Sequence, residues 1–151
     1  MVACKSILYC TDFSEGARLA LPHAVDMAKK YGAMLHLVHV YQEPDHLSAF
    51  ELSADVQMEW VRVAQSVGVE TDKKLEQLCN EVSAETGPCT HKVLRGRPHV
   101  EIIRYARENQ VDLIILASHG LSGWEHALFG STAEKVVRES PCTVMVVKRP
   151  V

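Results

Sequence analysis

The sequence predicts an α/β protein whose core is an open, mostly or wholly parallel sheet of five strands with four helices. Two observations lead to this fold class. Short apolar runs typical of buried strands alternate along the chain with segments whose apolar residues recur at helical spacing. The chain has 151 residues, of which 47% are hydrophobic and 23% charged, which is ordinary for one soluble globular domain covering residues 1–151.

Each predicted strand is a short run rich in branched apolar residues, with turn-forming residues at both ends. The runs are Ser6 to Cys10, Met34 to Val40, a third that begins near Thr90 and contains Val93 and Leu94, Leu113 to Ala117, and Thr143 to Val147. A helical crossover joins the last two runs, so their strands should be parallel.

The first predicted helix follows the first strand, and Asp12 or Ser14 is placed to cap it. Gly32 is suited to end its apolar stripe. A long second helical region ends at Gly87-Pro88. Its apolar residues are expected near one face, namely Trp60, Val63, Val67, Leu75, Leu78 and Val82.

The third predicted helix begins at the Gly96-Arg97-Pro98 turn, because Pro98 suits a first-turn position that needs no amide hydrogen. Residues at helical spacing continue it, namely Val100, Ile103, Ala106 and Arg107. In the fourth helix, Ser131 and Glu134 form a capping-box pattern, in which both side chains would satisfy backbone amides. Pro141 prevents this helix from continuing.

The segment between the fourth strand and the fourth helix carries phosphate-binding chemistry. Ser118-His119-Gly120 breaks the strand sharply, and Gly130 precedes the expected helix cap. A helix N-terminus presents N–H groups and the positive end of the helix dipole, and a glycine beside it lets an anion approach the backbone closely. The sequence therefore predicts an anion site here.

Three motifs in this chain resemble those of universal stress proteins. Ala117-Ser118-His119-Gly120, nine residues ending at Phe129, and then Gly130-Ser131 resemble the family's G-x2-G-x9-G-[ST] nucleotide loop. The stretch from Ile7 to Ser14 is similar to its first strand and (T/V)D.S turn, and Gly96-Arg97-Pro98 to its G-x-P turn. The resemblance spans the chain and implies strand order 3-2-1-4-5, with the first and fourth strands adjacent where ligands bind in such sheets.

The resemblance further implies a stress-response regulator that binds an adenine nucleotide, either ATP or ADP or AMP, with Mg²⁺ as a possible companion of the phosphates. Asp12 would hydrogen-bond the base or ribose, Val40 would line the base pocket, and the loop and helix residues would cradle phosphates. The implied nucleotide-binding residues are Thr11, Asp12, Val40, Ala117, Ser118, His119, Gly120, Gly130, Ser131 and Thr132.

Two features depart from the family pattern. Ala117 stands where the motif has its first glycine, so a methyl group intrudes where the backbone would approach the ligand. No Lys or Arg occurs between Arg107 and Lys135, and the spacer holds Glu125 and His126 instead. We therefore expect modest affinity or a preference for a less charged adenine nucleotide. The alternative is a dimeric interaction protein of the same family that binds no nucleotide.

No catalytic residue and no metal site are predicted. The chain lacks the G-x4-G-K-[ST] pattern, so the remaining enzymatic alternative is slow ATP hydrolysis or autophosphorylation centred on His119 and Ser131. Leu94-Arg95-Gly96 stands where a response-regulator receiver needs its acceptor aspartate, which excludes that class. His36 and His39 should point to opposite faces of one strand and cannot share a metal.

Charge and hydropathy exclude other classes of partner. The net charge of −3 argues against nucleic acid, which requires a basic face. No apolar run approaches the roughly 18 residues of a membrane span, and no signal-peptide pattern is found, so we expect a cytoplasmic protein with no membrane partner. The five cysteines form no C-x-x-C, which fits reduced, packed thiols.

Two segments suggest further contacts. The run from Thr143 to Val147 is apolar almost throughout and, by the resemblance, lies at a sheet edge, so we expect a homodimer formed by antiparallel pairing of this strand with its copy. The stretch from Tyr31 to Val61 contains no Lys or Arg and gathers Glu43, Asp45, Glu51, Asp55 and Glu59. We interpret the connection that follows the second strand as a solvated loop, with a lid or partner-docking segment over the ligand site as the alternative.

Overall fold

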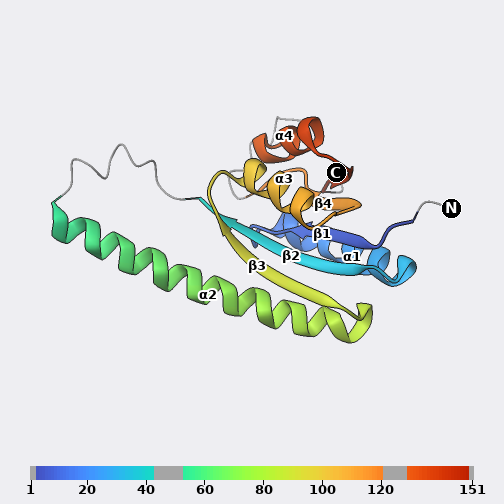
Figure 1. The fold of residues 1–151 in the computed structure, drawn as a ribbon, viewed down its shortest axis with the longest axis horizontal. Coiled ribbons are helices and arrows are strands. Elements are labelled where there is room, and N and C mark those ends of the chain that lie inside the picture. The colour runs from blue at the N-terminus through green and yellow to red at the C-terminus, as the bar shows by residue number, and fades with distance from the viewer. Residues whose placement is uncertain (1–2, 43–52, 121–128, 150–151) are drawn as a thin grey trace.

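The computed structural model describes residues 3–42, 53–120 and 129–149, which form one parallel sheet of five strands and four helices (Figure 1). The elements in chain order are β1 (Ser6–Cys10), α1 (Glu15–Tyr31), β2 (Met34–Tyr41), α2 (Ala54–Thr86), β3 (Cys89–Arg95), α3 (Pro98–Glu108), β4 (Leu113–Ala117), α4 (Ser131–Glu139) and β5 (Thr143–Val147). The strand order is β3-β2-β1-β4-β5. The predicted fold class and strand order are therefore confirmed.

The sheet separates two apolar layers, because successive side chains of a strand point to opposite faces. Ile7 and Tyr9 of β1 pack on the face that α1 and α2 cover, together with Leu75 of α2. Leu8 and Cys10 pack on the opposite face, which α3 and α4 cover. Both layers contain side chains of β1, β2 and β4, so these strands are buried on both faces and read as continuous apolar runs.

The ends of α1 follow the sequence prediction. Ser14, rather than Asp12, is the N-cap, and its hydroxyl accepts a hydrogen bond from the amide of Ala17 at 3.1 Å. Gly32 ends the helix in the left-handed conformation, with φ 61°. The hydroxyl of Tyr9 donates to the carbonyl of Ala17 at 2.6 Å, and burial raises the pKa of Tyr9 to about 12, so this phenol stays protonated and holds α1 on the sheet.

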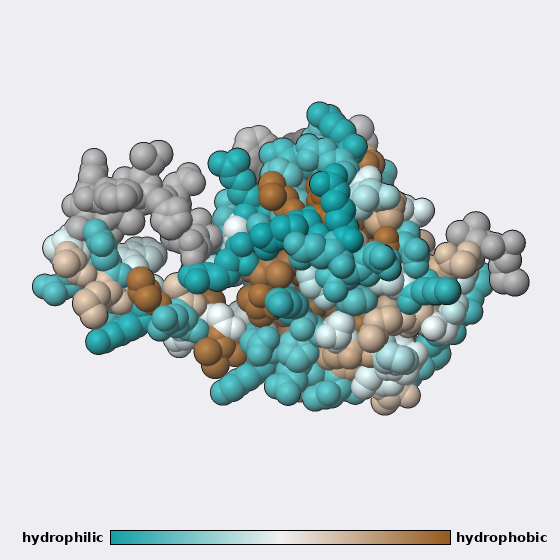
Figure 2. Space-filling model, viewed as in Figure 1, coloured by the Kyte–Doolittle hydropathy of each residue, from teal (hydrophilic) through white to brown (hydrophobic). Residues whose placement is uncertain are grey.

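The long second helix is confirmed, but the sheet buries only the C-terminal part of its apolar face. Leu75 and Val82 are buried, whereas Trp60, Val63 and Val67 are 40–55% exposed. The helix has 33 residues and is therefore about 50 Å long, while the seven residues of β3 span only about 23 Å. The N-terminal half of α2 consequently projects past the sheet (Figure 1), and hydrophobic side chains appear on its surface (Figure 2).

Two details of the last helices differ from prediction. Pro98 is the first residue of α3, as predicted, but Val100 is exposed, and the buried face instead includes Ile102 and Tyr105. The prediction of a capping box formed by Ser131 and Glu134 is wrong. The carbonyl of Gly130 accepts the first helical hydrogen bond, from the amide of Glu134 at 3.0 Å, so the glycine is the N-cap. The Glu134 carboxylate binds Arg138 one turn later instead of reaching back.

Candidate ligand-binding site

A cavity of ≈ 360 Å³ lies at the carboxyl ends of β1, β2 and β4 and beside the N-terminus of α4. Adjacent parallel strands whose connections leave in opposite directions open such a crevice. The structure brings all ten residues implied by the family resemblance to its wall, together with further residues. These further residues are Cys10, Ala17, Val38, His39, Tyr41, Gln42, Pro98, Ile102, Leu116 and Ala133.

The turn after β1 presents Asp12 to this cavity. The Thr11 amide donates to the carbonyl of Val38 at 2.9 Å, which fastens the turn to β2. The Thr11 hydroxyl accepts from the amide of Phe13 at 3.0 Å, and Asp12 Oδ1 accepts from the amide of Ser14 at 2.9 Å. Phe13 has φ 61°, an unusual conformation for a residue with a side chain. Several hydrogen bonds thus hold the turn in a conformation that sets the position of Asp12.

The turn after β4 lies directly against the turn after β1. A Cβ atom on Gly120 would overlap the carboxylate of Asp12, so only glycine leaves that carboxylate its present position. Their contact joins the two strand ends that the resemblance placed side by side. Asp12 therefore lies in the cavity wall where the two turns meet, and its carboxylate oxygens are hydrogen-bond acceptors.

Main-chain hydrogen bonds tie the β4 turn to its neighbours. The Ser118 amide donates to the carbonyl of Val147 at 2.9 Å, and the Gly130 amide donates to the carbonyl of Ser118 at 2.6 Å. The Ser118 hydroxyl and His119 Nδ1 lie 3.0 Å apart. Because the Gly130 amide already has an acceptor, Gly130 contributes space rather than a donor. The available donors at this end are the first-turn amides of α4, including those of Ser131 and Thr132, for which a helix provides no acceptor.

Gly16 lets the start of α1 lie against the turn after β4, next to the alanine that replaces the first glycine of the loop motif. A Cβ on Gly16 would lie 3.4 Å from the Cβ of Ala117 and 2.8 Å from the carbonyl oxygen of His119. The carbonyl oxygen of His119 therefore approaches α1 as closely as it does because residue 16 has no side chain, whereas the methyl group of Ala117 would be in ordinary contact with an added Cβ.

Two residues that the sequence did not assign to the site lie beside it. His39 lines the cavity, and its Nδ1 donates to the carbonyl of Thr11 at 2.8 Å, since a carbonyl oxygen can only accept. When the imidazole ring of His39 is neutral, its Nε2 therefore carries no hydrogen and is an acceptor. Lys148 places its Nζ 5.3 Å from the ring centroid of Phe129, which precedes Gly130. Lys148 follows β5, 19 residues beyond Phe129, so the packing of β5 beside β4 and not a local pattern brings this cation to Phe129.

The cavity wall also contains a thiol, that of Cys10. Burial raises the pKa of the Cys10 thiol well above its usual range, so this cysteine is a poor nucleophile. Among the described residues, no group of three or more His, Cys, Asp or Glu side chains could hold a metal ion. Mg²⁺ usually binds through one or two carboxylates and ligand phosphates, so Asp12 and the hydroxyls of Ser131 and Thr132 suit it only together with a phosphate ligand.

Fold and site together define an α/β protein with a strand-end crevice suited to a ligand that carries an anionic group. The family model of universal stress proteins matches residues 4–148. The chain therefore belongs to the universal stress protein family, as its motifs predicted.

Individual relatives agree with this assignment. Universal stress protein MJ0577 of Methanocaldococcus jannaschii is 31% identical over 96% of this chain and 95% of its own length. The solved structure of MJ0577 has a TM-score of 0.85 and covers 99% of both chains. Two structures at or below 20% identity share the fold: a universal stress protein in complex with cAMP (TM-score 0.68, 97% of this chain and 98% of that one) and one from Archaeoglobus fulgidus in complex with dAMP (0.64, 96% and 98%).

Proposed function

We propose that the strand-end cavity binds an adenine nucleotide and that its occupancy switches the protein's interactions in a stress response, without efficient turnover. The observation that carries the proposal is that all ten residues implied by the family motifs line this cavity. Its volume of ≈ 360 Å³ lies within the roughly 300–1,000 Å³ of small-molecule pockets.

The two ends of the cavity differ in chemistry, as a nucleotide requires. Val38, Val40 and Ile102 provide an apolar wall for a base, and Asp12 lies between them and the β4 turn. Ser131 and Thr132 lie at the N-terminus of α4, where amides and the helix dipole favour a phosphate. The cAMP and dAMP complexes of proteins with this fold support an adenine ligand with one phosphate.

The charges around the site favour a nucleotide with few phosphates. The N-terminal end of the α4 dipole carries only a partial positive charge. Lys148 lies over the ring of Phe129 and is not among the residues that line the cavity. We therefore expect AMP and ADP to bind at least as tightly as ATP without Mg²⁺. Replacing Lys148 with Gln should weaken ATP more than AMP, because the triphosphate has more charge for this cation to attract.

Calorimetric titration with AMP, ADP and ATP, with and without Mg²⁺, tests the proposal. Ser131→Asp places a carboxylate at the expected phosphate position and leaves the helix intact, because an acidic side chain is favourable in a first turn. Ser66→Asp makes the same change of charge on an exposed position of α2 and is the matched control. We expect Ser131→Asp to lower affinity at least about tenfold and Ser66→Asp to leave it unchanged.

A nucleotide-free interaction protein is the second candidate. Two observations favour it: Ala117 replaces the motif's first glycine, and the Gly130 amide is already bonded to Ser118. This candidate predicts no heat of binding from any of the three nucleotides at millimolar concentration. The same titration therefore decides between the two functions.

A further inference from the structure

Two cysteines that lie apart from the ligand cavity meet where α2 packs on β3. Cys79 lies in the C-terminal third of α2, and Cys89 is the first residue of β3. Gly87-Pro88 reverses the chain, so the end of α2 lies along the beginning of β3 (Figure 1). Their Sγ atoms are 2.7 Å apart, and both cysteines are free thiols. A disulfide bond between them would require little movement of the backbone, because the two side chains already point at each other.

We propose that Cys79 and Cys89 form a modification site, a dithiol that oxidants of the peroxide class convert into an intramolecular disulfide. The thiolate of one cysteine attacks a peroxide oxygen, the O–O bond breaks, and a sulfenic acid and water form. The second thiol attacks that sulfur, the S–O bond breaks, and a second water leaves. Two thiols and one hydrogen peroxide thus yield one disulfide and two waters.

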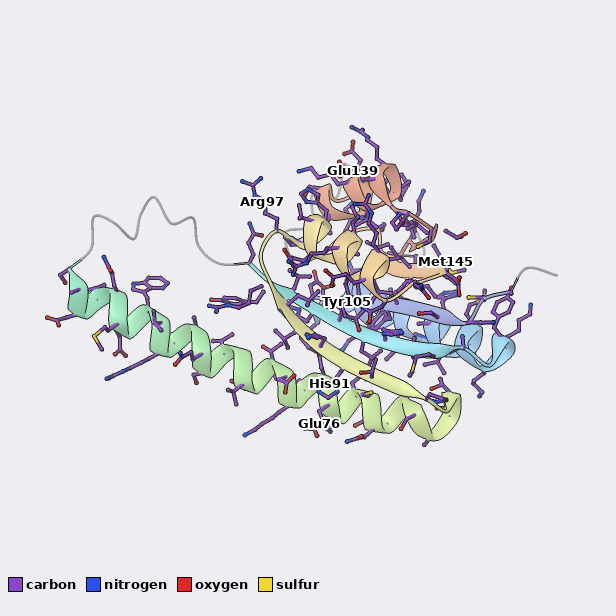
Figure 3. All side chains as sticks on the ribbon, in the orientation of Figure 1. Glu76, His91, Arg97, Tyr105, Glu139 and Met145 are labelled. Carbon is purple, nitrogen blue, oxygen red and sulfur yellow. The ribbon has the colours of Figure 1, made fainter. Side chains whose placement is uncertain are left out.

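Metal binding does not account for this pair. Structural zinc sites need four ligands. Within residues 3–42, 53–120 and 129–149, no group of three or more metal-ligating side chains could hold an ion. His91, labelled on β3 in Figure 3, lies on the same face of that strand, two residues beyond Cys89. Its Nε2 lies 3.5 Å from a carboxylate oxygen of Asp72 on α2. Among the described residues, the shortest hydrogen-bond contact of each thiol sulfur is with the other thiol, while Cys89 Sγ also lies 3.8 Å from the carbonyl oxygen of Thr90.

The burial of the two thiols sets the order and the rate of the reaction. Cys79 is only 6% exposed, whereas Cys89 is partly accessible, so Cys89 meets the oxidant first and Cys79 resolves its sulfenic acid. Burial, and the neighbouring Cys79, raise the pKa of the Cys89 thiol well above its usual range. Little thiolate is present at neutral pH, so the pair responds to sustained rather than brief exposure to peroxide.

The disulfide would join α2 to the edge strand of the sheet. It closes a short loop around the Gly87-Pro88 turn and removes conformational freedom from the unfolded chain, which predicts a rise in Tm of roughly 5–10 °C. Cys89 lies at the amino end of β3, whereas the ligand cavity lies at the carboxyl ends of the strands. Oxidation should therefore leave nucleotide affinity unchanged, and the inference stands apart from the proposed function.

Mass spectrometry of the reduced full-length protein after treatment with excess hydrogen peroxide tests the site. Trypsin cannot separate the two cysteines, because no Lys or Arg lies between Lys74 and Lys92, so cleavage after Glu81 and Glu85 is needed. We expect a Cys79–Cys89 linked peptide that has lost two hydrogen atoms, a higher Tm, and reversal of both by dithiothreitol.

Three variants complete the experiment. Cys79→Ala and Cys89→Ala should each abolish the linked peptide and the rise in Tm, while Cys142→Ala, which removes a partly buried thiol elsewhere, should retain both. The inference is overturned by a disulfide that uses another cysteine, by a link between two chains, or by Cys89 sulfinic acid beside unmodified Cys79. A wild-type protein that keeps five free thiols under sustained peroxide also overturns it.

Discussion

At the scale of single residues, glycines determine how closely the parts of the site approach one another. Gly16 lets the first turn of α1 lie against the β4 turn, and Gly120 makes room for the carboxylate of Asp12. A local sequence pattern does not show why either position requires glycine. In both cases the atom that a Cβ would contact belongs to a residue far away in the sequence. The motif positions were predictable, whereas the reason for Gly16 was not.

Gly16→Ala should distort the site. The added Cβ would lie 2.8 Å from a backbone oxygen, that of His119, which cannot rotate away. We expect a loss of about 1–3 kcal/mol in the free energy of unfolding, measured by urea denaturation, and weaker nucleotide binding. Gly68→Ala is the matched control, since nothing lies within 4 Å of its new Cβ in α2, and it should stabilise by roughly 0.5–1 kcal/mol. Equal effects of both variants would contradict this account.

His36 should make stability depend on pH. It is buried, with Nδ1 3.0 Å from the Tyr105 hydroxyl and Nε2 3.1 Å from the Ser6 hydroxyl, and burial lowers its pKa below the ordinary 6.5 (Figure 3 shows Tyr105 on α3). Above pH 6.5 the ring is neutral in both states. Below it, the unfolded chain binds a proton that the folded protein does not, so stability falls by up to about 1.4 kcal/mol per pH unit.

Urea denaturation of wild type and His36→Gln, at pH 7.5 and again at pH 5.5, checks this dependence. Glutamine can donate to one hydroxyl and accept from the other, but it does not titrate. The stability advantage of the wild type over the variant should therefore shrink as the pH falls. An advantage that stays constant or grows would show that another group carries the pH dependence.

At the scale of elements, α2 is the helix that sequence periodicity described least well. Its apolar residues recur at helical spacing throughout, but the sheet offers only enough length to bury the C-terminal half. Periodicity reports which residues share a face of a helix, whereas burial depends on what lies opposite that face. The acidic residues Asp55 and Glu59 lie in the exposed first turns of α2, and the rest of the predicted loop or lid lies in residues 43–52, outside the described residues.

Substitutions in the two halves of α2 should differ sharply in cost. Leu75→Ala removes a fully buried side chain of the core and should cost about 2–5 kcal/mol in the free energy of unfolding. Trp60→Ala removes a larger side chain that is 55% exposed and should change stability by no more than about 0.5 kcal/mol. Denaturant titration of the monomeric or dimeric form at fixed protein concentration measures both. A comparable loss for Trp60→Ala would mean that the projecting half is packed in solution.

At the scale of the whole molecule, the order of the strands determines which surfaces remain available. β5 is an edge strand, as the resemblance implied, and it pairs in parallel with β4 on one side. Homodimerisation through its other side is our prediction, because an unpaired edge can extend the sheet into a second copy.

No helix among the described residues is long and apolar enough to cross a membrane.

Val146→Pro tests this edge pairing. The Val147 carbonyl accepts from Ser118 of the β4 turn, and backbone groups alternate in direction along a strand, so the amide of Val146 points away from β4. Proline at this position should remove an outward donor and leave the β4–β5 ladder intact, which predicts a monomer in analytical ultracentrifugation. Val146→Thr retains the amide and should remain dimeric. A dimeric proline variant would locate the interface elsewhere.

The sequence by itself determined the fold class and the five strands and four helices of the described residues, because hydrophobic periodicity and turn residues are local properties. The strand order and the ten residues of the candidate site were implied by motif resemblance, and nucleotide binding by those ten residues stays a prediction. Tertiary structure decided the rest. In the folded protein Gly130, not Ser131, is the N-cap of α4, and the Gly130 amide donates to the carbonyl of Ser118. Lys148 lies beside Phe129. Tertiary structure also placed Cys79 against Cys89. Each of these contacts depends on how elements pack against one another, and no local pattern encodes that packing.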